Sequence, residues 1–259
     1  MAMAAEKAAR ALVRDFGEVE QLQVSRKGPA DFVSTADTKA EKTLVRELSK
    51  ARPNFGFLLE EQGEIAGVDP MNRWIIDPLD GTTNFLHGLP HFAISIALEY
   101  DKEVIAGVIY DPVRDEMFWS ERGQGTYLND KRLRVSGRDQ LSEGLFATGI
   151  PFMGILEDGG HQLFIRQLEN VMGVTSGVRR WGAASLDLAY VAAGRYDGFW
   201  ENGLNPWDVA AGILMVREAG GQVTDISGRR YELGAANICA SNDAFHKPLR
   251  TLLRDAQAI

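Results

Sequence analysis

One stretch limits what this chain can fold into more than any other: WIIDPLDGTTNFLHG, from Trp74 to Gly88. Its first residues are apolar and predict a short buried strand, yet the strand runs directly into two aspartates, Asp77 and Asp80. Open α/β sheets place their ligands at the C-terminal edges of strands. The stretch therefore predicts a buried strand that brings carboxylates to a site at the edge of a sheet.

Length and composition indicate a globular protein with a sizeable core. The 259 residues are 45% hydrophobic, and no window approaches the roughly 20 apolar residues of a membrane span. No linker or repeat divides the chain, so we expect a single domain over residues 1–259. The N-terminus lacks the apolar centre of an export signal, and one cysteine, Cys239, cannot form an internal disulfide. We therefore expect a cytoplasmic location and no membrane partner.

The charge balance bears on possible partners. Lys and Arg number 28 and Asp and Glu number 36, which gives a net charge of −8. Direct binding of nucleic acid needs a basic face and is therefore not expected. A site that gathers acids around cations is compatible with this balance.

The hydrophobic pattern changes from strand-rich to alternating along the chain. In the first half it predicts a helix with Leu12, Phe16 and Val19 on one face, and a second helix after Ser34–Asp37. Strands are predicted at 55–61 and 73–77, then an antiparallel meander over 91–100, 102–112 and 115–121. The second half predicts helices at 162–172, 182–194 and 206–220 and after Asn242, with strands at 195–201 and 221–225. This order indicates sheets layered with helices in one unit.

Four acids are distinguished by their positions: Glu60, Asp77, Asp80 and Asp208. Glu60 and Asp77 each close an apolar run, and Pro78 should end the strand and stiffen the turn before Asp80. Asp208 opens an apolar helix, where a carboxylate meets the positive end of the helix. Each also has a plain structural interpretation, as a turn former, a helix cap or a solvated acidic pair with Glu61. Their joint occurrence favours a functional cluster.

Several carboxylates without basic neighbours repel one another unless divalent cations bind them. Hard oxygen ligands suit Mg²⁺, with Mn²⁺ as a possible substitute, and the four histidines lack a zinc-binding spacing. Gly81, Thr82 and Thr83 add backbone N–H groups and hydroxyls that suit a phosphate. This combination indicates metal-assisted hydrolysis of a phosphate ester.

Other phosphatase and hydrolase chemistries lack their motifs in this chain. There is no GxxxxGK[ST] loop, no GxSxG elbow, and Phe245 stands where a cysteine phosphatase would need arginine six residues after Cys239. Asp77 and Asp80 are three residues apart, whereas an aspartyl-phosphate enzyme of the haloacid dehalogenase type needs a spacing of two. Attack by a metal-activated water molecule is the hydrolase chemistry that remains.

These motifs resemble the inositol monophosphatase family, of the bacterial inositol-1-monophosphatase type. WIIDPLDGTTNFLH resembles the first family signature, WDVAAGILMVREAGG (207–221) resembles the second, and LLEEQGE supplies the acidic pair upstream. The resemblance runs from about Lys27 to Asn242. It implies an α+β fold, a layered α-β-α-β-α sandwich of the sugar phosphatase type shared with fructose-1,6-bisphosphatase, and a homodimer.

The resemblance also implies a role for each site residue. It assigns Glu60, Asp77 and the Leu79 carbonyl to a first Mg²⁺, and Asp77, Asp80 and Asp208 to a second. A third, weaker ion would use Glu60 and waters. Thr82 and Glu60 would activate the attacking water, with Asp37 supporting Thr82.

The implied substrate-binding residues lie in several separate segments: Lys27, Gly81, Thr82, Gly182, Ala183, Ala184, Glu201 and Asp208. Glu201 would accept hydrogen bonds from inositol hydroxyls. Trp181 and Ala183 depart from the smaller or hydroxylated residues expected in this pocket wall, which leaves the choice of leaving alcohol open.

Two functions of different classes follow. One is a Mg²⁺-dependent, lithium-sensitive phosphomonoesterase acting on inositol 1-phosphate. Its rival substrates are fructose 1,6-bisphosphate, histidinol phosphate, adenosine 3′,5′-bisphosphate and NADP. The other is a non-catalytic regulatory partner of the transcription machinery with a relict site. The complete set of acids together with Thr82 favours the enzyme.

Overall fold

The structure, a computed structural model, describes residues 1–18, 24–28, 31–151 and 160–256; the side chains of 24–28 and 31–33 are outside that description. The helices are α1 (Ala2–Phe16), α2 (Thr35–Ala51), α3 (Thr82–Leu86), α4 (Gly160–Met172), α5 (Ala184–Ala192), α6 (Pro206–Glu218) and α7 (Asp243–Asp255), with a 3₁₀ turn, η2, at Leu141–Glu143. No helix among the described residues has the length and apolar character needed to cross a membrane.

The strands form two large sheets and one small hairpin. The first sheet has the order β10-β9-β8-β7-β6-β5-β3-β4, and the second has the order β12-β11-β13-β15-β14. The first comprises β3 (Phe55–Leu59), β4 (Gly63–Ile65), β5 (Asp69–Asp80), β6 (Ala93–Tyr100), β7 (Glu103–Asp111), β8 (Glu116–Glu121), β9 (Gly125–Leu128) and β10 (Lys131–Arg132). The second comprises β11 (Leu145–Thr148), β12 (Gly177–Arg179), β13 (Gly198–Asn202), β14 (Gln222–Thr224) and β15 (Asn237–Ser241). The hairpin pairs β1 (Val24–Gly28) with β2 (Asp31–Ser34).

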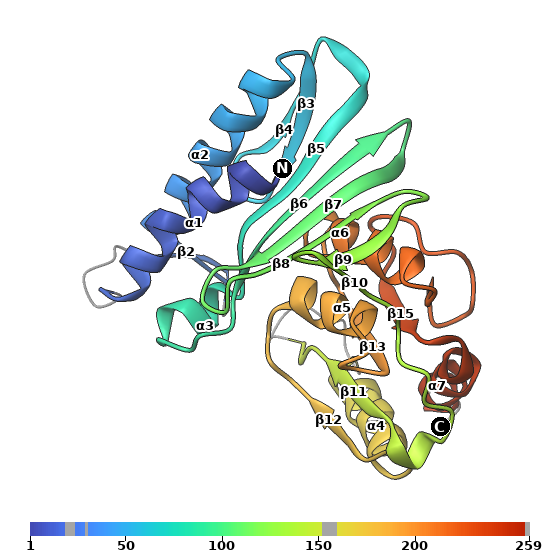
Figure 1. Ribbon diagram of the computed structural model, residues 1–259. Coiled ribbons are helices and arrows are strands. Elements are labelled where there is room, and N and C mark those ends of the chain that lie inside the picture. Colours follow the sequence, from blue (N-terminus) through green and yellow to red (C-terminus); the bar gives the residue numbers. More distant parts are fainter. Residues whose placement is uncertain (19–23, 29–30, 152–159, 257–259) are drawn as a thin grey trace.

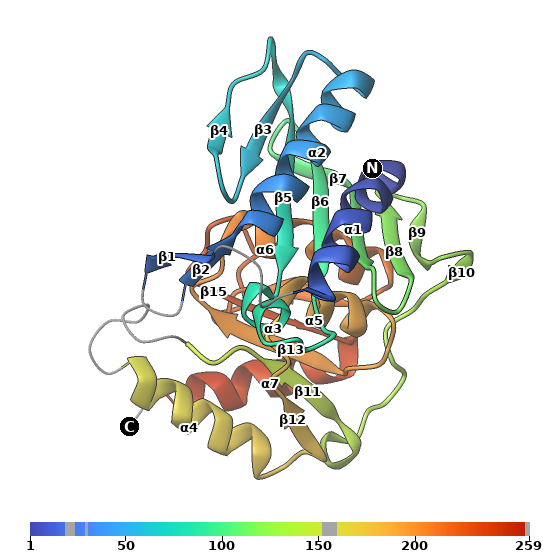
Figure 2. The same cartoon turned by 90° about the vertical axis from the view of Figure 1, so that its left-hand side faces the viewer.

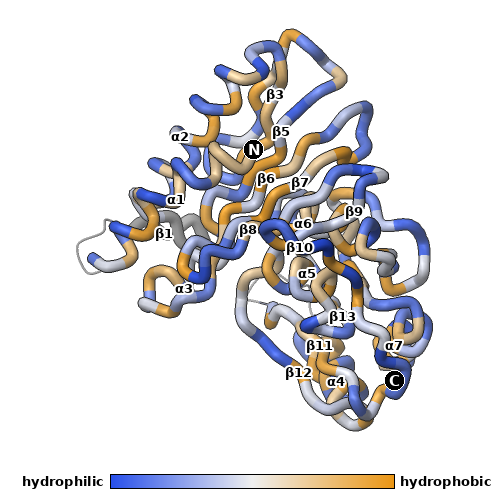
Figure 3. Tube along the Cα trace, in the orientation of Figure 1, coloured by the Kyte–Doolittle hydropathy of each residue, from blue (hydrophilic) through white to orange (hydrophobic). Residues whose placement is uncertain are grey.

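Helices and sheets alternate in five layers (Figures 1 and 2). Helices α1 and α2 cover one face of the first sheet, α5 and α6 lie between the two sheets, and α4 and α7 cover the outer face of the second. Three apolar cores correspond to the three contacts between helices and sheets. In Figure 3 the hydrophobic colour follows the central strands β5 to β7, while the outer turns of α2 are hydrophilic. The predicted α-β-α-β-α sandwich is confirmed.

Small residues explain why α6 can lie in the middle layer. A Cβ atom on Gly212 would lie 2.5 Å from the Leu188 Cβ of α5, and one on Gly107 of β7 would lie 3.0 Å from the Ala211 backbone. Close backbone approach therefore requires glycine at both positions. Because α6 packs against α5 on one side and the first sheet on another, it is apolar nearly all round. This packing fixes the position of Asp208 in its first turn.

The predicted meander of β6, β7 and β8 is confirmed, as are the helices of the second half. The second helix begins at Thr35, inside the Ser34–Asp37 segment that was expected to precede it. Ser34 and Asp37 form a capping box there, which explains the earlier start. The face predicted for α1 buries Leu12, while Val19 lies outside the described residues.

Candidate active site

Parallel pairing of β3 with β5 places the first two acids side by side. Leu59 is in register with Ile76, and the Glu60 N–H donates to the Ile76 carbonyl at 3.2 Å. Glu60 and Asp77 therefore follow their strands at the same edge of the sheet. Glu60 and Asp77 are 17 positions apart in the sequence, and this pairing brings them together.

A bulge in β5 brings Asp80 to the same site. Asp77 pairs with Ser95 and Asp80 with Ala93 of β6, so three steps along β5 match two along β6. Residues three apart on a regular strand point to opposite faces, and one extra residue restores the same face. The expectation that Pro78 ends the strand is wrong, because β5 continues to Asp80 through the irregularity. The Leu79 N–H donates to the Asp77 carboxylate at 2.9 Å and holds the bulge.

Gly81 and helix α3 follow β5 directly and place Thr82 close to these acids. Gly81 has φ 91°, in the left-handed region, and a Cβ atom there would lie 3.0 Å from the His91 carbonyl, so glycine is required. The Thr82 hydroxyl lies 2.9 Å from the Leu79 carbonyl and 3.1 Å from Asp37 Oδ1. It has one proton, so it donates to one of these acceptors at a time. Asp37 is fully buried, and its other oxygen accepts from the Ser34 backbone and hydroxyl.

Asp208 reaches the site from the first turn of α6. The helix is capped by Asn205, whose N–H donates to Asp208 Oδ2 at 2.7 Å in a capping box. Asp208 is therefore the third helical residue rather than the cap itself. The Ser95 hydroxyl of β6 donates to the Trp207 carbonyl at 3.3 Å, which ties the start of the helix to the strand beside Asp77.

The acids interact strongly with one another. Burial, followed by the charges of Glu60, Asp80 and Asp208, raises the pKa of Asp77 well above its ordinary value. Burial raises the pKa of Asp80 to about 6, although hydrogen bonds from Ser185 oppose the shift. Burial and the charge of Asp80 likewise raise the pKa of Asp208. The carboxyl groups therefore lie close together in a poorly hydrated place without enough positive charge to balance them.

The donor set fits a hard divalent cation, although it does not form a closed cage. Among the described residues, no three His, Cys, Asp or Glu side chains converge in an arrangement that would hold a metal as they stand. One oxygen of Asp80 accepts from Ser185, and one of Asp208 accepts from Asn205. Each keeps a second oxygen, and carboxylate oxygens in this number suit Mg²⁺.

A cavity of about 170 Å³ adjoins the acids. Its lining comprises Glu60, Asp80, Gly81, Thr82, Thr83, Gly149, Arg180, Gly182, Ala183, Ala184, Glu201, Leu204 and Asp208. Most of the site residues expected from the sequence are thus brought together, while the buried Asp37, Asp77 and Leu79 support the cavity from behind. Lys27 lies in β1, and its side chain is outside the described part of the chain. Trp181 is absent from the described lining, and its exposed ring packs 5.1 Å from that of His91.

Glu201 also lines this cavity, near the end of β13. Burial and the charge of Asp80 raise the pKa of Glu201 to about 8, against the Arg180 charge and a hydrogen bond from the Gly149 backbone. A Cβ atom on Gly149 would overlap the Glu201 carboxyl group, so glycine makes room for it. Glu201 is therefore held against the cavity wall.

Several residues that line the cavity or contact the acids were not predicted from the sequence. Gly149, Arg180 and Leu204 line the cavity, and Ser185 holds Asp80. Asp187 of α5 is a further buried acid, and burial followed by the charges of Glu201 and Asp80 raises its pKa. Arg180, Ser185 and Asp187 lie in the segment RRWGAASLD, whose position before an apolar helix was a signal that could have found them.

The five-layer fold and its buried acid cluster beside a small polar cavity define a phosphatase-type site suited to hard cations. A family model described as the inositol monophosphatase family matches residues 1–258. The chain belongs to the inositol monophosphatase family, a family of phosphomonoesterases.

Known proteins resemble the chain over nearly its whole length. An inositol-1-monophosphatase of Mesorhizobium japonicum is 56% identical, covering 96% of this chain and 92% of the relative. A protein of Pseudomonas aeruginosa named Nus factor SuhB is 46% identical, covering 97% and 93%. The crystal structure of extragenic suppressor protein suhB from Bartonella henselae superposes with a TM-score of 0.95 at 57% identity, covering 98% and 96%.

Proposed function

We propose that this protein is a Mg²⁺-dependent phosphomonoesterase that hydrolyses inositol 1-phosphate to inositol and phosphate. The observation that carries the proposal is the cluster of Glu60, Asp77, Asp80 and Asp208: burial raises the pKa values of the three aspartates, and the charges of neighbouring acids add to the shift of Asp77 and Asp208. Cations would relieve this repulsion and attract a phosphate dianion to the same place. Family membership supports both magnesium dependence and the reaction class.

The acids would hold two or three ions. Glu60, Asp77 and the Leu79 carbonyl are proposed for one, and Asp77, Asp80 and Asp208 for the second. Bound Mg²⁺ would lower the pKa of a water molecule and neutralise charge on the phosphate. We assign the substrate phosphate to the N–H groups of Gly81 and Thr82, since N–H groups in the first turn of a helix lack intrahelical acceptors.

Thr82 is proposed to orient the attacking water together with Glu60. Its hydroxyl can donate to Asp37 Oδ1, 3.1 Å away, which leaves the hydroxyl oxygen free to accept from water. Burial raises the pKa of Asp37, while hydrogen bonds from Ser34 and Thr82 favour its charged form. Asp37 thus positions Thr82 without contacting the substrate.

Glu201 is proposed to bind the alcohol side of the substrate. It lines the same cavity as Glu60, Asp80 and Asp208, together with Gly182, Ala183 and Ala184. A carboxyl group there can accept hydrogen bonds from polyol hydroxyls. We propose inositol 1-phosphate over the rival phosphate esters because relatives named inositol-1-monophosphatase are 53–56% identical.

A substrate panel tests the proposal. Release of inorganic phosphate would be measured with excess Mg²⁺ and with EDTA, for inositol 1-phosphate and each rival ester. The expected result is Mg²⁺-dependent release with the highest kcat/KM for inositol 1-phosphate. No release from any ester would contradict an enzymatic role, and a higher kcat/KM for a rival would reassign the substrate.

A second candidate is a contact role in transcription. Relatives named Nus factor SuhB are 46% and 42% identical over most of the chain, and such a role needs no catalysis. We rank it second because the site keeps its full set of acids and Thr82. A homodimer and a cytoplasmic location remain proposals alongside either function.

A further inference from the structure

Asp80 is held in place from the start of helix α5. The Ser185 N–H donates to Asp80 Oδ2 at 2.8 Å, and the Ser185 hydroxyl donates to the same oxygen. The two residues are 105 positions apart in the sequence, and both are buried. Because both donors belong to one residue, they fix the orientation of the carboxyl group as well as its position.

Ser185 is itself firmly supported. It is the second residue of α5, and eight of the nine residues of that helix are buried. N–H groups in the first turn of a helix lack intrahelical acceptors, and the cap residue, Ala183, makes no side-chain hydrogen bond to them. Asp80 supplies the acceptor for Ser185 from a distant strand, so the helix and the carboxylate stabilise each other.

The Ser185 hydroxyl serves Asp80 rather than the helix. Serine side chains in helices commonly turn to solvent or to a nearby backbone carbonyl, whereas this hydroxyl is buried and donates to Asp80. Alanine, which occupies positions 183 and 184, is the better helix former. The helix would therefore form as well or better with alanine at position 185.

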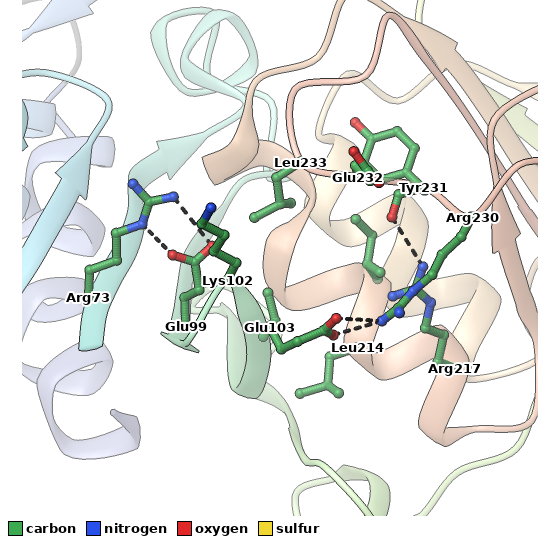
Figure 4. A pocket seen from close by; sticks show the side chains of 12 residues that line it. Arg73, Glu99, Lys102, Glu103, Leu214, Arg217, Arg230, Tyr231, Glu232 and Leu233 are labelled. Atoms are coloured by element: carbon green, nitrogen blue, oxygen red, sulfur yellow. Dashed lines mark hydrogen bonds and ion pairs between the residues drawn. The ribbon is translucent and has the colours of Figure 1, made fainter. Parts of the chain in front are cut away.

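The donors on Asp80 orient it without neutralising it. Two carboxylates that line the larger cavity of about 450 Å³, beside the C-terminal half of α6, are held differently (Figure 4). There Arg73 pairs with Glu99 at 2.5 Å, and Arg230 pairs with Glu103 at 2.7 Å. Within the described part of the chain Asp80 has no such cationic partner, and a hydroxyl and an N–H leave its negative charge in place. That charge remains available to a cation.

Both contacts from Ser185 also leave one oxygen of the carboxylate unused. They end on Oδ2, so Oδ1 can bind an ion while Oδ2 stays hydrogen-bonded. Groups that orient a metal ligand from outside the coordination sphere typically change metal affinity about 10–100-fold.

We propose that Ser185 is a positioning residue for the second metal ion: its hydroxyl and N–H hold Asp80 Oδ2, keep Oδ1 for the ion, and raise the affinity of the site for Mg²⁺. The inference rests on the proposed function, since it concerns the same ion site.

Calorimetry tests the inference without turnover. Mg²⁺ would be titrated into the full-length protein after metal removal with EDTA and dialysis. Ser185→Ala should weaken binding at one ion site about tenfold or more. Ser185→Thr keeps the hydroxyl and should bind close to wild type, which separates the hydrogen bond from packing. The matched control, Ser120→Ala, removes another buried hydroxyl, which donates to the Gly125 carbonyl, and should leave Mg²⁺ binding unchanged.

Thermal melting separates positioning from a structural role. Mg²⁺ raises the melting temperature of a protein that binds it. Loss of a structural contact would lower the melting temperature equally in EDTA and in Mg²⁺, whereas loss of positioning should reduce the gain that Mg²⁺ gives. The Mg²⁺ concentration for half-maximal phosphate release should likewise rise in Ser185→Ala.

Three results would overturn the inference. They are Mg²⁺ binding by Ser185→Ala as tight as by wild type, an equal loss in Ser120→Ala, and a folded Ser185→Thr as weak as Ser185→Ala. If Ser185→Thr does not fold, the two alanine variants still decide. A wild type that binds no Mg²⁺ would contradict the proposed function, and this inference with it.

Discussion

Asp80→Asn should stabilise the metal-free protein at neutral pH, relative to the wild type, while it abolishes turnover. Burial raises the pKa of Asp80 from 3.8 to about 6. An acid whose pKa is higher in the folded state binds its proton more tightly there, so its contribution to stability is complete below the unfolded pKa. That contribution is lost as the pH rises from about 4 through about 6.

The magnitude follows from the shift. The difference between about 6 and 3.8 is about 2.2 pKa units, or about 3 kcal/mol at 1.36 kcal/mol per unit. Asp80 is only 9% exposed, so solvent screening reduces this little. Asparagine does not ionise, and its oxygen can still accept from the Ser185 N–H, 2.8 Å from the present carboxylate. For a chain of this size, about 3 kcal/mol corresponds to about 6 °C in melting temperature.

Thermal melting in EDTA at pH 5 and pH 7.5 measures the effect. At pH 5 about half of the contribution of Asp80 is already lost, so the wild type should lose about 3 °C more than Asp80→Asn between these pH values. The matched control, Asp130→Asn, removes one charge from an exposed turn residue and should follow the wild type. Excess Mg²⁺ should restore the wild type at pH 7.5. Parallel losses in wild type and Asp80→Asn would refute the inference that this buried carboxyl group ionises at a cost to stability.

Four further predictions concern catalysis. Asp77→Asn should lower kcat on the order of 10³-fold or more through loss of the bridging ligand, and turnover within tenfold of normal would contradict that role. Thr82→Ala should bind Mg²⁺ by calorimetry yet lose about 10²–10⁴-fold in kcat; a failure to fold would make Thr82 structural. Millimolar LiCl should inhibit phosphate release and KCl should not, whereas equal rates in both salts would remove the lithium prediction. Glu201→Ala should lower kcat/KM about 10- to 100-fold for inositol 1-phosphate and much less for p-nitrophenyl phosphate, and equal losses would place Glu201 at the metals.

The layered fold was predictable because its central strands are long and apolar. Strands β6, β7 and β8 are joined by short polar turns, so their meander is visible in the sequence. Helix α6 was equally clear, with proline in its first turn and a long apolar run behind it. Three short strands, β11, β12 and β15, were not predicted. Their pairing is decided by contacts between segments far apart in the chain.

The acids of the site were predictable and their arrangement was not. Each of the four follows or opens an apolar run, which is a local signal. The bulge that turns Asp80 to the same face as Asp77 depends on pairing with β6, which the sequence of β5 alone does not encode. The role of Gly149 likewise depends on a contact between distant segments. Its lack of a side chain matters only because Glu201 packs against it.

The acid cluster opposes the stability of the fold that holds it. Glu60 and Asp77 come from paired strands, Asp80 from a bulge and Asp208 from the first turn of a helix buried between two sheets. None of these rigid elements can move apart without disrupting an apolar core. Burial and then the charges of neighbouring acids raise the pKa values of Asp77 and Asp208, and this repulsion cannot relax by separation. It can relax by protonation or by cation binding, and at neutral pH cation binding leaves the carboxylates charged and brings positive charge to the cavity. A phosphate dianion needs that positive charge, so the same ions would stabilise the protein and bind its substrate.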